Sequence, residues 1–299
     1  MRLLYLIPRF IRHFLPERIT RFLLLRNWII QASLETNDSQ SAIKRYVDAL
    51  ELHDKTIKGK RVMVFGYGGR FDIGVALLEA GVDHVVLCEK YAQPDERHNR
   101  ALLDKYPTHL EILHPERSWW LSRSAFFRTY RDPAQSKDNV LVRPIPEHMT
   151  LLQADIREVT PEQCAPVDVV ISNSVYEHLD DVDGITKSLA ALTKHDGAQV
   201  HFIDLRDHYF KFPFEMLKFS KKVWYGWLNP TSNHNRFRFW DYRKVFEKYF
   251  RKLDIKVLER DESNFEKARP EILPEFISGK LEDDCVTLIS VVALQTGSR

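Results

Sequence analysis

The chain has 299 residues, 44% of them apolar and 29% charged, and a formal net charge of +2 at pH 7. This length allows one large α/β domain with attachments or two small domains, and the near-neutral charge excludes any argument for a partner from bulk charge. The three cysteines, Cys88, Cys164 and Cys285, are far apart and form no CxxC pair, so we expect no zinc site, no other metal and no disulfide framework. A reducing compartment such as the cytoplasm fits this cysteine usage. No apolar run approaches the ~20 residues of a transmembrane helix.

The N-terminal segment 1–31 is rich in apolar residues and arginine. Six arginines stand in its first 30 residues against a single acid, Glu17. Two interpretations stay open: a basic amphipathic segment on an anionic membrane surface, or a pair of helices packed on the rest of the chain with its arginines in water. Pro8 and Pro16 are predicted to break the segment, and "PERITRFLLLRNW" predicts a helix that starts at Pro16. The first interpretation predicts a peripheral protein at the inner face of the membrane.

The elements that follow alternate between short apolar runs and helical patterns. A helix is predicted within 36–57, and "KGKRVMVFGYG" is predicted to be a buried strand that ends in glycines. Strand, helix, strand and helix at short spacing predict a parallel sheet with covering helices. Two irregular stretches, 108–149 and 207–238, interrupt this rhythm, and we interpret the first as an insertion. The further predicted elements are helices over 73–81 (closed by Gly81), 94–107, 184–197 (closed by Gly197) and 241–250, and strands over 84–90, 150–156, 167–174, 198–205, 253–261 and 285–295.

The first predicted strand ends in Gly66-Tyr67-Gly68-Gly69, and the second ends in Glu89. Ligands of open α/β sheets bind beyond the carboxyl ends of the strands. Glycines there let the backbone turn sharply and approach a ligand, and a carboxylate about twenty residues later can accept hydrogen bonds from both ribose hydroxyls. Either feature alone could be only a tight turn or a helix cap.

The next two strand ends carry polar residues as well. Asp155 and Ile156 follow the third strand, where the acid could accept from the amine of an adenine and the aliphatic side chain could pack on its ring. Asn173 lies at the end of the fourth strand, where it could contact the ligand or an acceptor. Four such features in the right order indicate a nucleoside site more strongly than any one of them.

Two nucleotide motifs are absent from the sequence. The dinucleotide fingerprint G-x-G-x-x-G, counted from Gly66, requires a glycine where Phe71 stands, which argues against a nicotinamide-dependent oxidoreductase. No G-x-x-x-x-G-K-[ST] sequence is present, so a P-loop is excluded.

The stretch from about 60 to 205 resembles the class I S-adenosylmethionine-dependent methyltransferases. "VMVFGYGGR", "VVLCEK" and "LLQADI" resemble their first three motifs, and "VDVVISNSVYEHLDDVDGITKSLAALTKHDGAQVHFIDL" resembles their block from the fourth to the fifth strand. The first motif departs from the pattern twice, because Val64 or Phe65 replaces the acid before the glycines and Arg70 replaces the third glycine. The form G-x-G-G-R-F-D, with "IDLRDHYF", is similar to methyltransferases encoded with bacterial surface-polysaccharide genes.

The resemblance implies a Rossmann-like α/β fold, S-adenosylmethionine as the cofactor and a particular set of cofactor residues. The sheet would have seven strands, the last one antiparallel, with a helical extension over 1–50, a methyltransferase domain over 51–299 and the insertion before the third strand. Arg70 would either point away at the helix start or reach the carboxylate of the cofactor. The expected cofactor-binding residues are Gly66, Tyr67, Gly68, Arg70, Glu89, Asp155, Ile156 and Asn173.

Methyl transfer from a sulfonium is an in-line displacement, so the main task is to align acceptor, methyl group and sulfur. A hydroxyl acceptor also needs a base. His178 follows the fourth strand, and "IDLRDHYF" places His208 near Asp204 and Asp207, either of which could orient it as a base. The alternatives are a histidine packed under the cofactor for His178 and a solvated polar loop for the others.

Two further segments could bind an acceptor. "NPTSNHNRFRFWDY" contains His234, Asn235, Arg236 and Arg238, which could bind an anionic or sugar-like substrate or could form a surface loop. The insertion could be a substrate lid or a helical hairpin with its own small core; we expect no nucleic-acid partner, because acids and bases nearly balance. The lid residues would be Trp119, Trp120, Arg123, Phe126, Phe127, Arg128 and Tyr130.

The leading hypothesis is therefore a methyltransferase that acts on a glycan, a glycolipid or a small metabolite. A non-catalytic module that keeps the fold and binds a partner or a membrane is the alternative from another class. The altered first motif supports that alternative, whereas Glu89, Asp155 and "SNSVYEH" argue against it.

Overall fold

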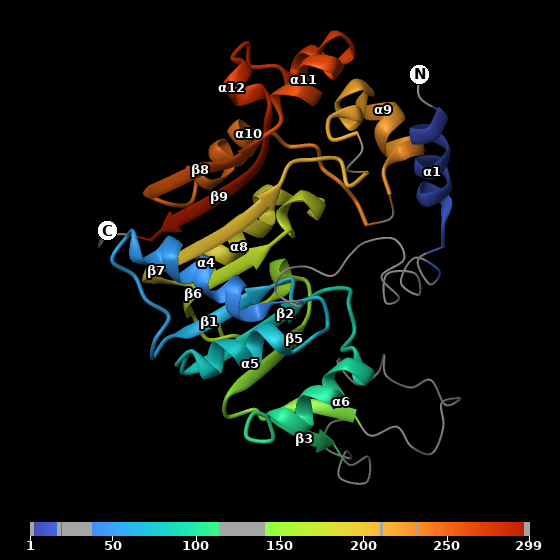
Figure 1. Cartoon of the computed structure of the whole chain (residues 1–299). Helices are drawn as coiled ribbons and strands as arrows, with labels where there is room; N and C mark the ends of the chain where they lie inside the picture. The colour runs from blue at the N-terminus through green and yellow to red at the C-terminus, as the bar shows by residue number, and fades with distance from the viewer. Residues whose placement is uncertain are drawn as a thin grey trace. The chain divides into compact units, whose positions relative to one another are not determined.

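The computed structural model describes residues 3–16, 19, 38–113, 141–209, 212–230 and 232–295. By their contacts they fall into two compact units: Leu34–Ile171, the glycine-turn unit, and Met1–Ser33 with Ser172–Arg299, the C-terminal unit. Figure 1 labels most of the helices and strands given below. The helices are α1 (Leu3–Phe14), α4 (Ser39–Glu51), α5 (Asp72–Glu79), α6 (Glu96–Lys105), α8 (Val182–Leu192), α9 (Lys221–Val223), α10 (Phe239–Phe246), α11 (Glu262–Ala268) and α12 (Leu281–Asp284). The strands are β1 (Arg61–Phe65), β2 (His84–Glu89), β3 (Leu110–Leu113), β4 (Leu141–Pro144), β5 (Met149–Gln153), β6 (Val167–Asn173), β7 (Thr193–Asp204), β8 (Lys252–Arg260) and β9 (Val286–Leu294).

The strands form a seven-stranded sheet in the order β5-β2-β1-β6-β7-β9-β8. In the glycine-turn unit β5, β2, β1 and β6 are all parallel, and four of the five residues of β1 are buried, as expected of a strand covered on both faces. In the C-terminal unit β9 pairs antiparallel with both β7 and β8. The predicted Rossmann-like sheet with an antiparallel last strand is therefore confirmed.

Two helices of the glycine-turn unit pack one after the other beside its sheet. Helix α5 packs on β2, and α4 packs on α5. Gly81 follows α5 with a φ of 90°, so it ends the helix in the left-handed conformation that the sequence predicted for it. Strands β3 and β4 form a separate antiparallel pair inside the predicted insertion. The predicted lid residues from Trp119 to Tyr130 lie outside the described residues.

The helix predicted to close at Gly197 is shorter than expected. Helix α8 ends at Leu192, and Thr193 already has strand dihedrals. The Thr193 hydroxyl donates to Leu189 O at 2.7 Å, which occupies the carbonyl that the next helical N–H would use. Gly197 therefore lies within β7 rather than at a helix end.

The prediction that Pro8 breaks the N-terminal segment is wrong, because α1 continues through it from Leu3 to Phe14. An internal proline loses one helical hydrogen bond and costs about 3 kcal/mol in an isolated helix. Tertiary contacts offset this cost: Tyr5 is 1% exposed and Arg9 only 2%, and both are held by Asp207. The helix predicted from Pro16 lies almost wholly outside the described residues, and the division at residue 50 stays a prediction.

The C-terminal unit has an apolar core of its own beyond the sheet. Leu6 of α1 packs against this core. Among the residues that the structure describes, no helix has the length and apolarity to span a bilayer. The core residues are Phe214, Met216, Leu217, Trp224, Leu228, Phe265, Ala268, Ile272, Phe276 and Cys285.

Candidate functional site

The turn after β1 has a backbone that glycine alone adopts without strain. Gly66, Gly68 and Gly69 have φ values of 80°, 71° and 86°, in the left-handed region. A Cβ atom at Gly69 would lie 2.2 Å from Gln93 O, so a side chain there would collide with backbone. A Cβ at Gly68 would meet nothing within 4 Å, so the turn faces open space at that position.

A buried asparagine fixes the back of this turn. The Asn99 side chain is fully buried; its amide donates to Gly69 O at 3.0 Å and its oxygen accepts from Phe71 N at 3.1 Å. The backbone N–H of Asp95 also donates to Gly69 O, at 2.8 Å. Phe71 itself is 0% exposed, so the ring at the position of the missing glycine supports the turn from within the core.

Glu89 lies directly beside the open side of the turn. Its Oε2 accepts from Gly68 N at 3.2 Å, and its Oε1 accepts from the backbone N–H groups of Lys90 and Tyr91 at 2.9 and 3.0 Å. The carboxylate is therefore fixed between the ends of β1 and β2. The lone pairs that remain on its two oxygens are the acceptors that a ribose diol would need.

Arg70, which stands where the first methyltransferase motif has its third glycine, is partly exposed and forms an ion pair with Asp95. Its Nε donates to Asp95 Oδ2 at 3.2 Å. Asp95 also caps α6, because its Oδ1 accepts from His98 N. This pairing favours the interpretation in which Arg70 supports the helix start, and its predicted contact with a cofactor carboxylate stays a prediction.

The predicted third strand is β5, and its end is followed by a short 3₁₀ helix, η2 (Ile156–Glu158). Asp155 is the N-cap of this helix. Hydrogen bonds from Arg157, and then the Lys90 ammonium, hold the pKa of Asp155 well below its ordinary value. The carboxylate is thus ionised and lies 2.6 Å from Arg157 Nη2 and 2.9 Å from Lys90 Nζ. The contact with an adenine amine stays a prediction, because these cations already use part of its acceptor capacity.

The other predicted cofactor residues differ in burial. Ile156 is 2% exposed and Tyr67 6%, with the Tyr67 ring stacked on Phe71 at 6.2 Å between centroids. Desolvation by burial raises the pKa of Tyr67, so this phenol stays neutral. Asn173 is the last residue of β6 and is partly exposed.

In the C-terminal unit three histidines meet. The ring of His208 lies 4.7 Å from that of His178 and 4.8 Å from that of His234 between centroids. Burial lowers the pKa of all three rings, to about 2 for His208, so they are neutral at pH 7. His178 Nδ1 is 2.8 Å from Asn233 O and His234 Nε2 is 2.9 Å from Arg206 O; each carbonyl accepts, which fixes the tautomers.

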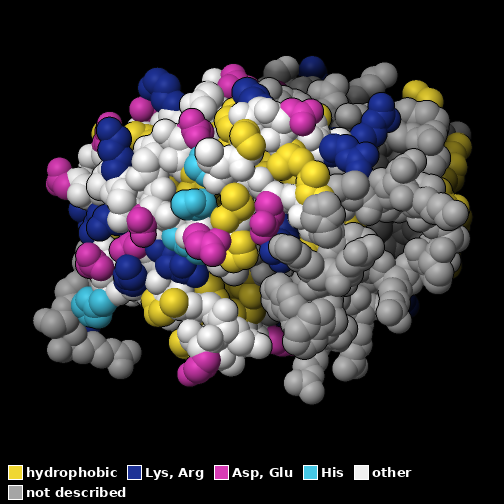
Figure 2. Space-filling model, turned by 90° about the horizontal axis from the view of Figure 1, so that it is seen from below, with side chains coloured by type: hydrophobic (Ala, Val, Ile, Leu, Met, Phe, Trp, Pro, Cys, Tyr) yellow, Lys and Arg dark blue, Asp and Glu magenta, His cyan; other side chains and the backbone are white. Residues whose placement is uncertain are grey.

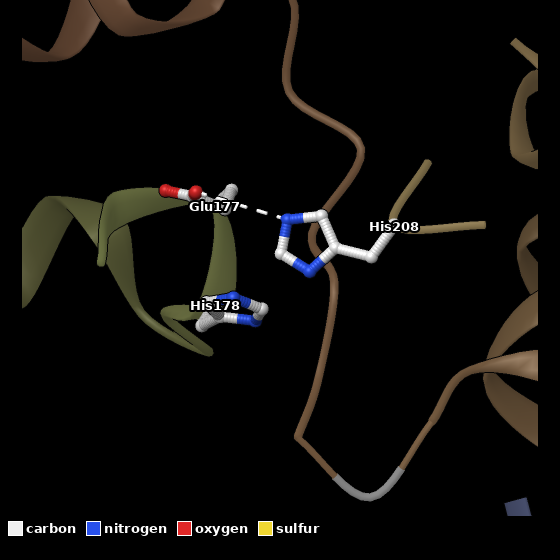
Figure 3. A group of neighbouring side chains, drawn as sticks. All are labelled: Glu177, His178 and His208. Carbon is white, nitrogen blue, oxygen red and sulfur yellow. Dashed lines mark ion pairs between the residues drawn. The ribbon is translucent and has the colours of Figure 1, made fainter. Parts of the chain in front are cut away.

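The carboxylate beside these rings is Glu177, which the sequence analysis did not single out. His208 Nε2 lies 3.9 Å from Glu177 Oε1 (Figure 3), and Glu177 and His178 both belong to the 3₁₀ turn η3 (Tyr176–His178). The adjacent acid and histidine in "VYEH" were the signal that could have identified it. A glutamate in a polar loop is normally solvated, however, and its burial depends on contacts far away in the chain.

Asp204 and Asp207, the predicted orienting acids, are bound by arginines. Arg206 donates to both oxygens of Asp204, with the shortest contact 2.7 Å from Nη2 to Oδ2. Asp207 is completely buried and accepts from the Tyr5 hydroxyl at 2.5 Å, while Arg9 forms an ion pair with it. Both acids thus position the segment that leads to His208, and their catalytic role stays a prediction.

The segment around His234 was predicted to bind a substrate or to form a surface loop, but its arginines are buried and bound within the protein. Arg236 Nη1 donates to Phe219 O at 2.6 Å, and Arg238 Nη2 donates to Asp284 O and Val286 O at 2.9 and 2.8 Å. Both guanidinium groups are buried and satisfy backbone carbonyls, which corrects the interpretation of these arginines as substrate ligands. The arginine–aromatic pattern that suggested binding is used for internal packing.

Comparisons with known proteins complete the description. No protein-family model matches the sequence, and no curated protein does either. Solved structures with a similar backbone fold include phosphoethanolamine N-methyltransferase 2 of Haemonchus contortus, with 11% sequence identity and a TM-score of 0.48. The match covers 96% of this chain and 60% of that one. Others are 1,6-didemethyltoxoflavin-N1-methyltransferase of Burkholderia thailandensis (12% identity, TM-score 0.45, 94% and 91% covered) and mitomycin 7-O-methyltransferase (16%, 0.45, 95% and 59%).

The fold assignment rests on the strand order and on the antiparallel β9. The class that they define is the Rossmann-like sheet of the methyltransferase type, with a glycine turn after β1 and an acid at the end of β2.

Proposed function

We propose that the chain is an S-adenosylmethionine-dependent methyltransferase. One observation carries the proposal: Glu89 accepts a hydrogen bond from Gly68 N, on a turn that is open to solvent at Gly68. This arrangement offers a close backbone approach and a ribose acceptor at the same place. Beyond the carboxyl ends of the strands of an open α/β sheet, a close backbone approach and a ribose acceptor are the features that bind a nucleoside.

The geometry supports the methyl donor over a dinucleotide. A dinucleotide fingerprint requires a third glycine so that the helix packs closely behind the pyrophosphate. Phe71 fills that position, and its backbone N–H already donates to Asn99. S-adenosylmethionine has no pyrophosphate, so it does not need this glycine.

For the acceptor we propose a glycan, a glycolipid or a small metabolite, as in polysaccharide biosynthesis. Acidic and basic side chains are interspersed over much of the face drawn in Figure 2, which supports a compact acceptor over nucleic acid. His178 and His208 are neutral at pH 7, so each imidazole has a nitrogen lone pair that could accept a hydrogen bond from an acceptor hydroxyl and orient it. Asp204 and Asp207 would position the segment that carries His208.

Calorimetry with separate titrations of S-adenosylmethionine and NAD⁺ tests the function. We expect saturable binding of S-adenosylmethionine with one site per chain and no heat of binding with NAD⁺. Absence of binding at millimolar S-adenosylmethionine would favour the non-catalytic module, and preferential binding of NAD⁺ would favour the oxidoreductase.

A second proposal concerns the surface to which the protein binds: we infer that α1 lies on an anionic membrane. Its exposed face is apolar, with Leu4 71% and Ile7 56% exposed, whereas Arg9 on the opposite face is buried. This is the reverse of an amphipathic helix packed on a domain with its arginines in water. The remaining large apolar side chains on this face are Phe10, Ile11 and Phe14.

A neighbouring segment extends the apolar face of α1. Trp227, in the π-helical turn η5 (Trp224–Leu228), is 53% exposed and stacks on Phe10 at 6.1 Å between centroids. Exposed Lys221 and Lys222 of α9 precede this turn. Aromatic and aliphatic side chains next to lysines match the boundary between the headgroups and acyl chains of an anionic bilayer.

Co-sedimentation tests this surface with vesicles of phosphatidylcholine that contain or lack phosphatidylserine. The intact chain should pellet with the anionic vesicles, and the double variant Phe10→Ser/Trp227→Ser should remain in the supernatant. Leu52→Ser, which changes an exposed leucine of the glycine-turn unit, is the matched control and should pellet normally. An intact chain that stays in the supernatant would refute the membrane proposal and leave the methyltransferase proposal untouched.

A further inference from the structure

Three potential metal ligands gather in the C-terminal unit. One ligand atom each of Glu177, His178 and His208 lies within 4.8 Å of the other two (Figure 3). Glu177 and His178 come from the same turn, while His208 comes from the segment after β7. Two imidazoles and one carboxylate are a ligand set that proteins use for Zn²⁺ and other divalent first-row metals.

Glu177 is an unusual residue for a mere structural role. The residue is 1% exposed, and within the described part of the chain neither carboxylate oxygen accepts a well-formed hydrogen bond. A buried carboxylate in such surroundings requires either a proton or a cation.

The histidines are set up to offer lone pairs. Because His178 Nδ1 donates to Asn233 O, its Nε2 carries the lone pair. Metal-bound histidines usually make this type of hydrogen bond from the other ring nitrogen, which orients the ring. His234 is arranged in the opposite tautomer: Nε2 donates to Arg206 O, and its buried Nδ1 has no hydrogen-bond partner among the residues that the structure describes.

We propose that Glu177, His178 and His208 bind one divalent transition-metal ion. Ligands of a tetrahedral Zn²⁺ are about 3.3 Å apart, given bond lengths of about 2.0–2.1 Å. The pair of His208 Nε2 and Glu177 Oε1, now 3.9 Å apart, would therefore close by about half an ångström. Imidazole nitrogens favour such a metal over Mg²⁺ or Ca²⁺, which prefer oxygen ligands.

The charged side chains around this site affect how tightly it would bind a cation. Arg9 and Arg206 each form an ion pair with a carboxylate, Asp207 and Asp204 respectively. The charge of Arg12 also acts on His208 and on His178. Arg12 is only partly buried, so removing this charge should strengthen the binding of a cation.

The inference concerns ion binding and needs no methyl transfer. Only its consequence rests on the proposed function: a metal at this site would lower the pKa of an acceptor hydroxyl that coordinates it. Glu177, His178 and His208 would hold the ion and exclude water. Without the ion, the two imidazoles would keep the role proposed for them above.

Zn²⁺ titration of the full, tag-free chain after treatment with a chelator tests the site, with Co²⁺ absorption as a second readout. We expect one Zn²⁺ per chain and a visible ligand-field spectrum with Co²⁺. Glu177→Gln and His208→Gln should each weaken Zn²⁺ binding by about tenfold or more, and Arg12→Gln should strengthen it. His195→Gln, a change at an exposed histidine of β7, should leave the affinity unchanged.

Circular dichroism of each variant identifies loss of folding, and the Co²⁺ spectrum of the unmodified chain needs no variant. No stoichiometric Zn²⁺ binding together with no Co²⁺ spectrum would overturn the proposal. Binding that survives unchanged in folded Glu177→Gln and His208→Gln would also overturn it. S-adenosylmethionine binding is measured separately, so either proposal can fail without the other.

Discussion

The glycine turn and the histidine cluster are both built from polar residues at strand ends, but the two are held in different ways. The turn is supported from behind by Asn99 and leaves Gly68 and Glu89 facing outward. The cluster lies among buried titratable groups, among them Glu177 and the ion pair of Arg9 and Asp207. A ligand can therefore reach the turn without rearranging its support, whereas any change in the cluster alters charges that the fold has already enclosed.

The largest expected effect comes from breaking the buried ion pair. Arg9→Ala should lower the free energy of unfolding by about 3–5 kcal/mol, because Asp207 would remain buried without its cation. Urea denaturation monitored by circular dichroism measures this. Lys44→Ala, which breaks an exposed pair with Asp48, should change stability far less, because solvent screens that pair. Equal effects of the two variants would show that Arg9 is not the anchor of α1.

The next effect tests whether the turn tolerates a side chain. Gly69→Ala combines a left-handed backbone with a Cβ that would contact Gln93 O, so we expect a loss of about 2–5 kcal/mol. Gly59→Ala has a φ of 65° but meets nothing within 4 Å, and should lose only about 1–2 kcal/mol. Thermal unfolding compares them. Similar losses would mean that the close contact at Gly69 contributes nothing.

The smallest expected stability effect is a dependence on pH from the buried histidines. Burial lowers the pKa of His208 to about 2 and that of His201 to about 3, below the value of about 6.5 in the unfolded chain. The unfolded state thus binds protons that the native state does not, and stability falls as pH drops below about 6.5. Between pH 7.5 and 5.5 each ring should cost about 1–1.5 kcal/mol.

Glu177 acts in the opposite direction, since its raised pKa stabilises the native state as pH falls. Urea midpoints at the two pH values give the balance, and His208→Gln should remove the share of that ring. A change in the free energy of unfolding between the two pH values that is identical in the unmodified chain and in His208→Gln would contradict a neutral, buried His208.

The sequence predicted the local features of the molecule better than the distant ones. The strand ends and the glycine turn follow from short apolar runs and from glycine chemistry, which are local, whereas the antiparallel last strand was implied by the resemblance to the methyltransferases. The end of α8 depends on the Thr193 hydroxyl, and the passage of α1 through Pro8 depends on Asp207, which is far away in the chain.

The same distinction explains the functional residues. Glu89 could be found because it ends a strand, whereas Glu177 looked like a solvated loop residue. Arg236 and Arg238 looked like substrate ligands because nothing in their neighbourhood shows the carbonyls of Phe219 and Asp284 that they satisfy. Burial of a charge depends on the whole fold, so single-sequence patterns do not reveal it.

The measurement that tests the central claim most directly is calorimetric titration of S-adenosylmethionine into the unmodified chain and into Glu89→Gln and Glu89→Ala. The account predicts saturable binding to the unmodified chain and a loss of about 1–3 kcal/mol of binding free energy in Glu89→Ala, with a smaller loss in Glu89→Gln, which keeps an oxygen acceptor. Unchanged affinity in both variants would contradict the role of Glu89, and no binding by the unmodified chain at millimolar ligand would contradict the claim that this turn is a methyl-donor site.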